Sequence, residues 1–300
     1  MKPQRQDVWV WNYRHDRVYT GPMGIQTELL ALVERVNERI TLPKVRQVYI
    51  PEPHITADKD AEFGLIELED GTAGLFYAWM GESQRGISER FSAAELVGAD
   101  AISIARHYAG NDDIARSVGL AAINAITQGF FHRADFELDE ATNSMGGLSL
   151  GPGDRLGMIG KFPSLVRQAS ALDVPVTVIE RKAHMLQDEA GVCITFDPGS
   201  LGACNKIITT AATLINNSID EMLGYCGHAE VLVMVGPSAS FFPDPLFARG
   251  VDFVGGTRVL DAGGVITQQR QGEGLRDCAR RYTLSRETYP GIADLGIDLS

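Results

Sequence analysis

The sequence predicts an α/β protein in which a small α+β domain precedes a Rossmann-like domain built on a parallel sheet. From about residue 154 onward, almost fully apolar runs such as VPVTVIER (174–181) and AEVLVMVGPSA (229–239) alternate with helical segments. Apolar strands of this kind are typical of parallel sheets that helices cover on both faces. Before residue 136, one helix and a few short strands precede a series of helices.

The length and composition agree with two globular domains. The chain has 300 residues, of which 44% are hydrophobic and 22% are charged, and these are ordinary values for a folded protein. Between Arg133 and Asp154 the apolar periodicity disappears, and the segment ends in Gly and Pro. We therefore expect a first domain at 1–135, a linker or interdomain loop at 136–153 and a ligand-binding domain at 154–300.

In the first domain, apolar residues at helical spacing predict a helix over 24–40. Three short strands follow, the last two joined by the turn residues Glu69-Asp70-Gly71. A long helix begins after Asp112, and its small residues allow close packing against a neighbour. The strands are expected at 45–51, 62–68 and 73–79, and two further helices at 91–98 and 99–110.

In the second domain, strands and helices alternate. Pro163 opens the first helix, where the missing N–H has no cost. The expected strands are 155–162, 174–181, 205–212, 229–239 and 251–259. The expected helices are 163–172, one over TLINNSIDEMLGYC after the third strand, and a short one at 243–250.

The charge pattern argues against nucleic acid and membrane partners. The formal net charge is −12, and no run of Lys or Arg is present, whereas nucleic-acid binding needs a clustered basic surface. The first 16 residues lack the pattern of a signal peptide, and no apolar run approaches the roughly 18 residues that span a bilayer. We expect a cytoplasmic protein whose four cysteines are reduced, because none forms a CxxC pair.

Ligands of a doubly wound sheet bind beyond the carboxyl ends of its strands. Gly160-Lys161-Phe162-Pro163 follows the first strand, where glycine lets backbone approach a ligand and the helix start favours an anion. The dinucleotide pattern GxGxxG is absent, which disfavours a dehydrogenase. A nucleoside ligand such as S-adenosylmethionine stays open.

An acidic residue ends the second strand. Glu180 lies 20 positions after Gly160, where Rossmann folds often bind ribose hydroxyls. It could equally be solvated or ion-paired on the surface. Glu180 and His184 are also weak candidates for acid–base catalysis, although a solvated loop histidine is an ordinary alternative for His184.

Hydroxyl-bearing residues follow the next two strands. Thr209, Thr210 and Thr213, with Asn216 one helical turn on, could cap the following helix or bind a carboxylate or phosphate. Gly236-Pro237-Ser238 is a turn that could present amides and a hydroxyl to a ligand, or be purely structural. It does not match GxSxG. The histidines and cysteines form no pattern typical of a metal site held by the protein alone.

Several segments, taken in order and spacing, resemble one family. They are SVGLAAINA (117–125), GMIGKFPSLV (157–166), VTVIER (176–181), TTAATLINNSIDEML (209–223), VGPSAS (235–240) and GVDFVGG (250–256). Together they are similar to the two-domain heavy-metal chelation family, whose members are described as domains of unknown function. The resemblance implies an enolase N-terminal-like domain followed by a Rossmann-like domain, with a site between them.

The resemblance also implies a set of ligand-binding residues and a class of ligand. Asn124 is polar within an alanine-rich helix, so a buried amide bonded to backbone is its ordinary alternative. Thr209-Thr210-Ala211 stands where the family often has Thr-Gly-Thr. The candidate ligand-binding residues are Asn124, Gly160, Phe162, Glu180, Thr209, Thr210, Asn216, Gly236 and Ser238.

Three functions remain open from the sequence. The first is an enzyme of condensation, hydrolysis or group transfer that makes or handles a metal-chelating metabolite of siderophore, pterin or flavin type. The second is a non-catalytic binder of a metal–chelator complex, and the third an S-adenosylmethionine-dependent methyltransferase-like enzyme. The partner would be a small molecule, with the metal bound through the chelator. The apolar segment GVDFVGG (250–256), taken as a sheet edge, leaves room for a homodimer.

Overall fold

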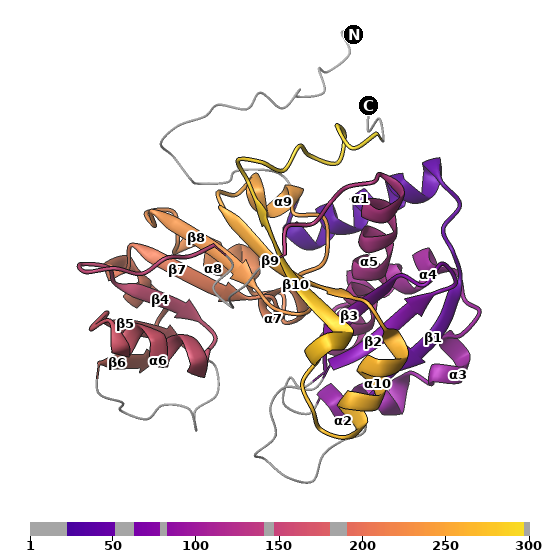
Figure 1. The fold of residues 1–300 in the computed structure, drawn as a ribbon, viewed down its shortest axis with the longest axis horizontal. Helices are drawn as coiled ribbons and strands as arrows, with labels where there is room; N and C mark the ends of the chain where they lie inside the picture. The colour runs from indigo at the N-terminus through magenta and orange to yellow at the C-terminus, as the bar shows by residue number, and fades with distance from the viewer. Residues whose placement is uncertain (1–22, 52–62, 79–82, 141–146, 181–190, 297–300) are drawn as a thin grey trace, which may run out of the picture.

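The computed structural model describes residues 23–51, 63–78, 83–140, 147–180 and 191–296. Within them the chain forms a three-stranded sheet and a seven-stranded sheet. In Figure 1 the larger sheet extends from β6 on the left to β9 and β10 in the centre, and the small sheet lies on the right. The predicted α/β fold class is confirmed.

The small sheet is an antiparallel meander in the order β1-β2-β3. Its strands are β1 (Val45–Tyr49), β2 (Phe63–Leu68) and β3 (Ala73–Tyr77), as the sequence predicted. Gly71, in the turn between β2 and β3, has a φ of 85°. Glycine adopts this left-handed conformation at little cost, which explains the turn at this point.

The helices of the first half differ from expectation between residues 83 and 109. The segment SQRGISER is the helix α2 (Ser83–Arg90), which its polar composition concealed. The expected helices at 91–98 and 99–110 were only partly right, because one-turn helices α3 (Ala93–Leu96) and α4 (Ala101–Ala105) form there. A 3-10 turn at Arg106–Ala109 follows α4.

The long helix α5 (Asp113–Arg133) is buried on almost all sides. The Asp112 carboxylate caps it by accepting a hydrogen bond from the Ala115 N–H at 2.9 Å. A Cβ on Gly74 of β3 would lie 2.0 Å from the Ala121 carbonyl oxygen. Only glycine therefore allows β3 to approach α5 this closely, as the small residues of α5 suggested.

The large sheet has the strand order β10-β9-β8-β7-β4-β5-β6. All neighbouring pairs are parallel except β9 and β10. The strands that the sequence predicted are β4 (Leu156–Ile159), β5 (Val176–Ile179), β7 (Lys206–Thr210), β8 (Val231–Val235) and β9 (Phe253–Val259). The outer strands β6 (Val192–Thr195) and β10 (Ala279–Ser285) were not predicted.

The helices of the second half are short. They are α6 (Pro163–Ala171), α7 (Ala212–Ile215), α8 (Ile219–Gly224), α9 (Asp244–Phe247) and α10 (Ala262–Arg270). The single helix expected after β7 was wrong, because Asn217 interrupts it with a φ of 54°. Asparagine tolerates this conformation better than most residues.

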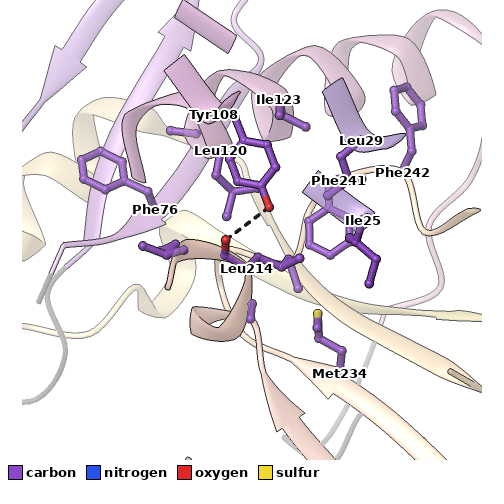
Figure 2. Packing of buried hydrophobic residues seen from close by; sticks show 14 of the residues in the cluster. Ile25, Leu29, Phe76, Tyr108, Leu120, Ile123, Leu214, Met234, Phe241 and Phe242 are labelled. Atoms are coloured by element: carbon purple, nitrogen blue, oxygen red, sulfur yellow. Dashed lines mark hydrogen bonds between the residues drawn. The ribbon is translucent and has the colours of Figure 1, made fainter. Parts of the chain in front are cut away.

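The two faces of the large sheet belong to different cores. The α6 face packs Leu165 and Val166 against strand residues such as Met158. The opposite face, under α7 and α8, shares one core with α1 (Ile25–Arg39) and α5. Figure 2 shows this shared core, where the Tyr108 hydroxyl donates to the Leu214 carbonyl at 3.3 Å.

Charged side chains also attach α1 to the second half. The Arg249 guanidinium, 2% exposed, forms an ion pair with Glu28 at 2.8 Å and lies 3.4 Å from Asp220. The Asp220 carboxylate accepts a hydrogen bond from the Ile25 N–H at 3.1 Å, at the start of α1. An acidic residue on α8 thus caps a helix that lies 195 residues away in sequence.

The helix α10, the last α-helix of the described residues, covers the outer face of the small sheet. Val265 and Ile266 of α10 pack against Tyr49, Leu65 and Leu75. The Gln269 carboxamide oxygen accepts a hydrogen bond from the Phe63 N–H at 2.8 Å. The proposed domain boundaries stay a prediction, but a segment from the second half completes the packing of the first.

The expected edge at GVDFVGG was wrong, because β9 lies between β8 and β10. Outside β10, the Thr283 N–H donates to the Asp139 carbonyl at 3.1 Å, and Glu140 forms an isolated bridge with Tyr282. Part of the expected linker therefore pairs with this edge. No helix in the described ranges is long and apolar enough to cross a membrane, and all four cysteines are free.

Asp244 is a half-buried carboxylate that holds the segment around residues 289–292 by hydrogen bonds. It accepts hydrogen bonds from the Tyr289 hydroxyl and the Ile292 N–H, both at 3.0 Å. Tyr289 in turn packs against Phe131, Phe136 and Phe247. Desolvation raises the pKa of the Asp244 carboxyl despite these hydrogen bonds.

We predict that the stability of Asp244→Asn increases relative to that of wild type as the pH rises. Because the pKa is higher in the folded state than in the unfolded chain, the folded wild type loses free energy of unfolding as the pH rises through the interval between them. Asparagine lacks this titration and keeps an acceptor for the Ile292 N–H. Urea unfolding of both proteins between pH 4 and 8 measures the difference, and a difference independent of pH would contradict this account.

Candidate functional site

The order of the large sheet reverses between β4 and β7. In doubly wound sheets the ligand lies beyond the carboxyl ends of the strands at such a point. Ile159 at the end of β4 pairs with Thr209 near the end of β7. Gly160 and Thr210 therefore leave the sheet side by side at this point.

Gly160 is fixed by contacts within the protein. It has a φ of 84°, and its N–H donates to the Ile179 carbonyl at 2.9 Å. A Cβ at this position would lie 2.8 Å from Thr210 Cγ2. Glycine is thus required both by its backbone conformation and by the adjacent methyl group, whether or not a ligand approaches it.

The threonine hydroxyls form hydrogen bonds at the start of α7, but the expected side-chain cap is not formed, because Ala211 occupies the N-cap position. The Thr210 hydroxyl accepts from the Ala212 N–H at 3.3 Å, and the Thr213 hydroxyl donates to the Thr210 carbonyl at 2.7 Å. The Thr210 side chain is half-buried, whereas Thr209 is fully buried in the strand. Because Thr210 only accepts here, its own proton can still be donated to a ligand.

The turn after β8 lies beside the end of β7. Gly236 has a φ of 151°, and a Cβ on it would lie 3.2 Å from the Ala211 Cβ. The Ala239 N–H donates to the Gly236 carbonyl at 2.9 Å, which closes a turn around Ser238. Ser238 is 2% exposed.

Asn124 joins this turn to the first half of the protein. Its Nδ2 donates to the Leu75 carbonyl of β3 at 2.8 Å and to the Ser238 carbonyl at 2.9 Å. The side chain is completely buried. The ordinary alternative of an amide bonded to backbone therefore holds, and it places α5 directly against the candidate site.

Glu180 continues from β5, the neighbour of β4. Its N–H donates to the Thr195 carbonyl at 3.0 Å, and its side chain is half-buried. Burial and, to a smaller extent, the Glu180 charge raise the pKa of Tyr77 at the end of β3. The Glu180 carboxylate therefore lies within electrostatic range of the Tyr77 phenol. Sequence reasoning missed Tyr77, although a tyrosine ending an apolar strand was the available signal.

Two other candidates, Asn216 and Phe162, have structural contacts away from the ends of β4 and β7. The Asn216 carboxamide oxygen accepts from the Ser218 N–H at 3.1 Å and hydroxyl at 2.6 Å, just before α8. Phe162 precedes α6 and packs in the core on the α6 face. Their ligand-binding roles stay predictions.

His184 lies outside the described residues. In the part of the chain that the structure covers, no three His, Cys, Asp or Glu side chains lie together in a group that could hold a metal ion. The residues that the structure brings together, directly or through Ala211, are Gly160, Thr210, Gly236, Ser238 and Asn124. Their ability to bind a ligand stays a prediction.

Two family models match the chain, and both carry the description "Putative heavy-metal chelation". One, DUF4213, matches residues 61–127, and the other, DUF364, matches residues 144–287. Between them they cover β2, β3 and most of α5, and then every strand of the large sheet.

Three relatives are described as uncharacterized or of unknown function. An uncharacterized protein of Methanocaldococcus jannaschii is 24% identical over 151 residues, which are 50% of this chain and 57% of that protein. A DUF364-family structure from Pyrococcus horikoshii covers 87% of this chain and 98% of its own, with 19% identity and a TM-score of 0.63. One from Desulfitobacterium hafniense covers 88% and 100%, with 18% identity and a TM-score of 0.60. Both structures share the fold of this chain.

We predict that Gly160→Ala lowers the free energy of unfolding by about 1–3 kcal/mol, because alanine is strained at this φ and its Cβ meets Thr210 Cγ2. Thr210→Ser removes that methyl group but keeps the hydroxyl. The double variant should therefore regain part of the loss, with a coupling of at least about 0.5 kcal/mol. Urea unfolding of all four proteins measures the coupling, and strict additivity would show that the methyl contact has no role.

Proposed function

Because the chain belongs to the heavy-metal chelation family, we propose that it binds a metal-chelating small molecule of siderophore, pterin or flavin type. The site would lie at the carboxyl ends of β4, β7 and β8, facing α5. The observation that carries this proposal is the continuous contact from Gly160 and Thr210 through the Gly236 turn to Ser238 and Asn124. It joins both halves of the chain where the strand order reverses.

The side chains here suit a polar ligand. The Thr210 hydroxyl can donate a hydrogen bond, the Glu180 carboxylate can accept one, and Tyr77 contributes a phenol from the first half. In this proposal the ligand's own donor atoms hold the metal, so the protein needs no metal-binding cluster of its own. The net charge of −12 favours small cationic or metal-loaded ligands over nucleic acid or an anionic membrane.

The proposal includes condensation, hydrolysis or group transfer on the bound chelator. Glu180 would accept a proton, and Tyr77, whose pKa is raised, would keep its phenolic proton and donate a hydrogen bond. A non-catalytic binder would use the same contacts without turnover. Incubation of any ligand that binds, followed by mass spectrometry, separates these two possibilities.

A second candidate ligand is a nucleoside such as S-adenosylmethionine. The observation in its favour is the strand order β6-β5-β4-β7-β8-β9, which is that of dinucleotide-binding Rossmann domains. Glu180 directly follows β5, the strand next to β4, where such domains place an acid that binds ribose hydroxyls. If S-adenosylmethionine is the only probe that binds, a methyltransferase-like function is favoured.

The test is a thermal-shift and calorimetric screen of the full chain. The probes are S-adenosylmethionine, a pterin, riboflavin, and the ferric and zinc complexes of 2,3-dihydroxybenzoate. Each metal complex is compared with its free metal ion. Native mass spectrometry of the purified protein shows in parallel whether a ligand or metal co-purifies. We expect a chelator complex to bind more tightly than its free metal.

We predict that Glu180→Gln weakens binding of the stabilising probe about tenfold or more, as expected for loss of a charged hydrogen bond. Its Tm without ligand should stay close to wild type, because the half-buried carboxylate lies at a strand end. The control is Glu95→Gln, an exposed acid on α3. Equal binding by both variants, or an unfolded Glu180→Gln protein, would contradict the proposed site.

A further inference from the structure

Two buried polar atoms at the contact between α5 and the turn after β8 have no partner. Among the described residues, neither Asn124 Oδ1 nor Ser238 Oγ forms a hydrogen bond. Asn124 is 0% exposed and Ser238 is 2% exposed. Buried polar atoms in native proteins are nearly always paired, because their lost hydration is otherwise not replaced.

The orientation of the Asn124 amide is fixed by its neighbours. Its Nδ2 donates to the carbonyls of Leu75 and Ser238. If the amide were turned over, its oxygen would face these two carbonyl oxygens, and neither of them can donate. Oδ1 is therefore an acceptor that needs an N–H or O–H donor.

The Ser238 hydroxyl lies on the residue whose carbonyl binds Asn124, so the two unpaired atoms belong to one contact. Ser240, two residues further, differs: its hydroxyl donates to the Thr257 carbonyl at 2.8 Å and accepts from the Thr257 N–H at 3.2 Å. One hydroxyl of this loop thus stabilises the fold, and the other is left unpaired beside the candidate site.

We propose that the ligand donates an N–H to Asn124 Oδ1 and Ser238 Oγ, so that this pair selects ligands with an amine, amide or hydroxamic acid N–H. The O–H groups of a chelator lose their protons when they hold the metal, which leaves an N–H as the remaining donor. This inference rests on the proposed function and names the class of ligand. A carboxylate or phosphate lacks a donor, and Asn124 Oδ1 would repel it. At this point of the site the protein therefore prefers an N–H group to an anion.

The first test uses stability without any ligand. Ser238→Ala removes a buried hydroxyl that has no partner, so its Tm should equal or exceed that of wild type. The matched variant Ser240→Ala breaks two hydrogen bonds and should lower the Tm by about 2–4 °C. If Ser238→Ala lowers the Tm as much as Ser240→Ala, a structural partner satisfies the hydroxyl and the inference is wrong.

The second test compares acetohydroxamic acid with N-methylacetohydroxamic acid, which differs by replacing the N–H with N–CH₃. In NMR titrations, wild type should bind the first about tenfold more tightly, and Ser238→Ala should lose most of this preference. Equal binding of both compounds by wild type, or binding of neither, overturns the inference. The proposed function fails separately, if no chelator complex binds in a manner that depends on Glu180.

Discussion

The packing of α5 against two partners at once determines how the rest of the molecule is arranged. On one side the helix meets β3 so closely that Gly74 has no room for a side chain. On that same side Asn124 donates hydrogen bonds both to Leu75 of β3 and to the turn after β8. A buried helix with small residues on several faces allows such double contact. The candidate site exists because α5 holds the strand ends of one sheet against the last strand of the other.

Much of the fold could be predicted from periodicity, because apolar runs and helical stripes report burial directly. Strand β6 was missed because it is short and partly exposed, with Cys193 facing solvent. Helix α10 was not predicted either, because it has two glycines near its start and weak amphipathicity. It is held by its packing on the small sheet, and such tertiary stabilisation leaves little trace in the local sequence.

The sequence predicted which turns lie together at the strand ends, whereas their ability to bind a ligand stays a prediction. The rule that ligands lie beyond parallel strand ends pointed to Gly160, Thr210 and Ser238, and the structure brings these turns together. The sequence could not show that Asn216 closes the turn before α8 by bonding Ser218, since turn formation and ligand binding use the same polar atoms. Tyr77 was missed for a different reason: its relation to Glu180 depends on how the two halves dock.

The position of α10 has a consequence for synthesis on the ribosome. The strands of the small sheet are translated almost two hundred residues before residues 262–270 that cover their outer face. Until that helix emerges, the nascent chain presents Tyr49, Leu65 and Leu75 as an uncovered apolar surface, of the kind that chaperones bind. The amino-terminal half is therefore finished only after Arg270 has been made, and termination before that point yields a fragment prone to aggregate.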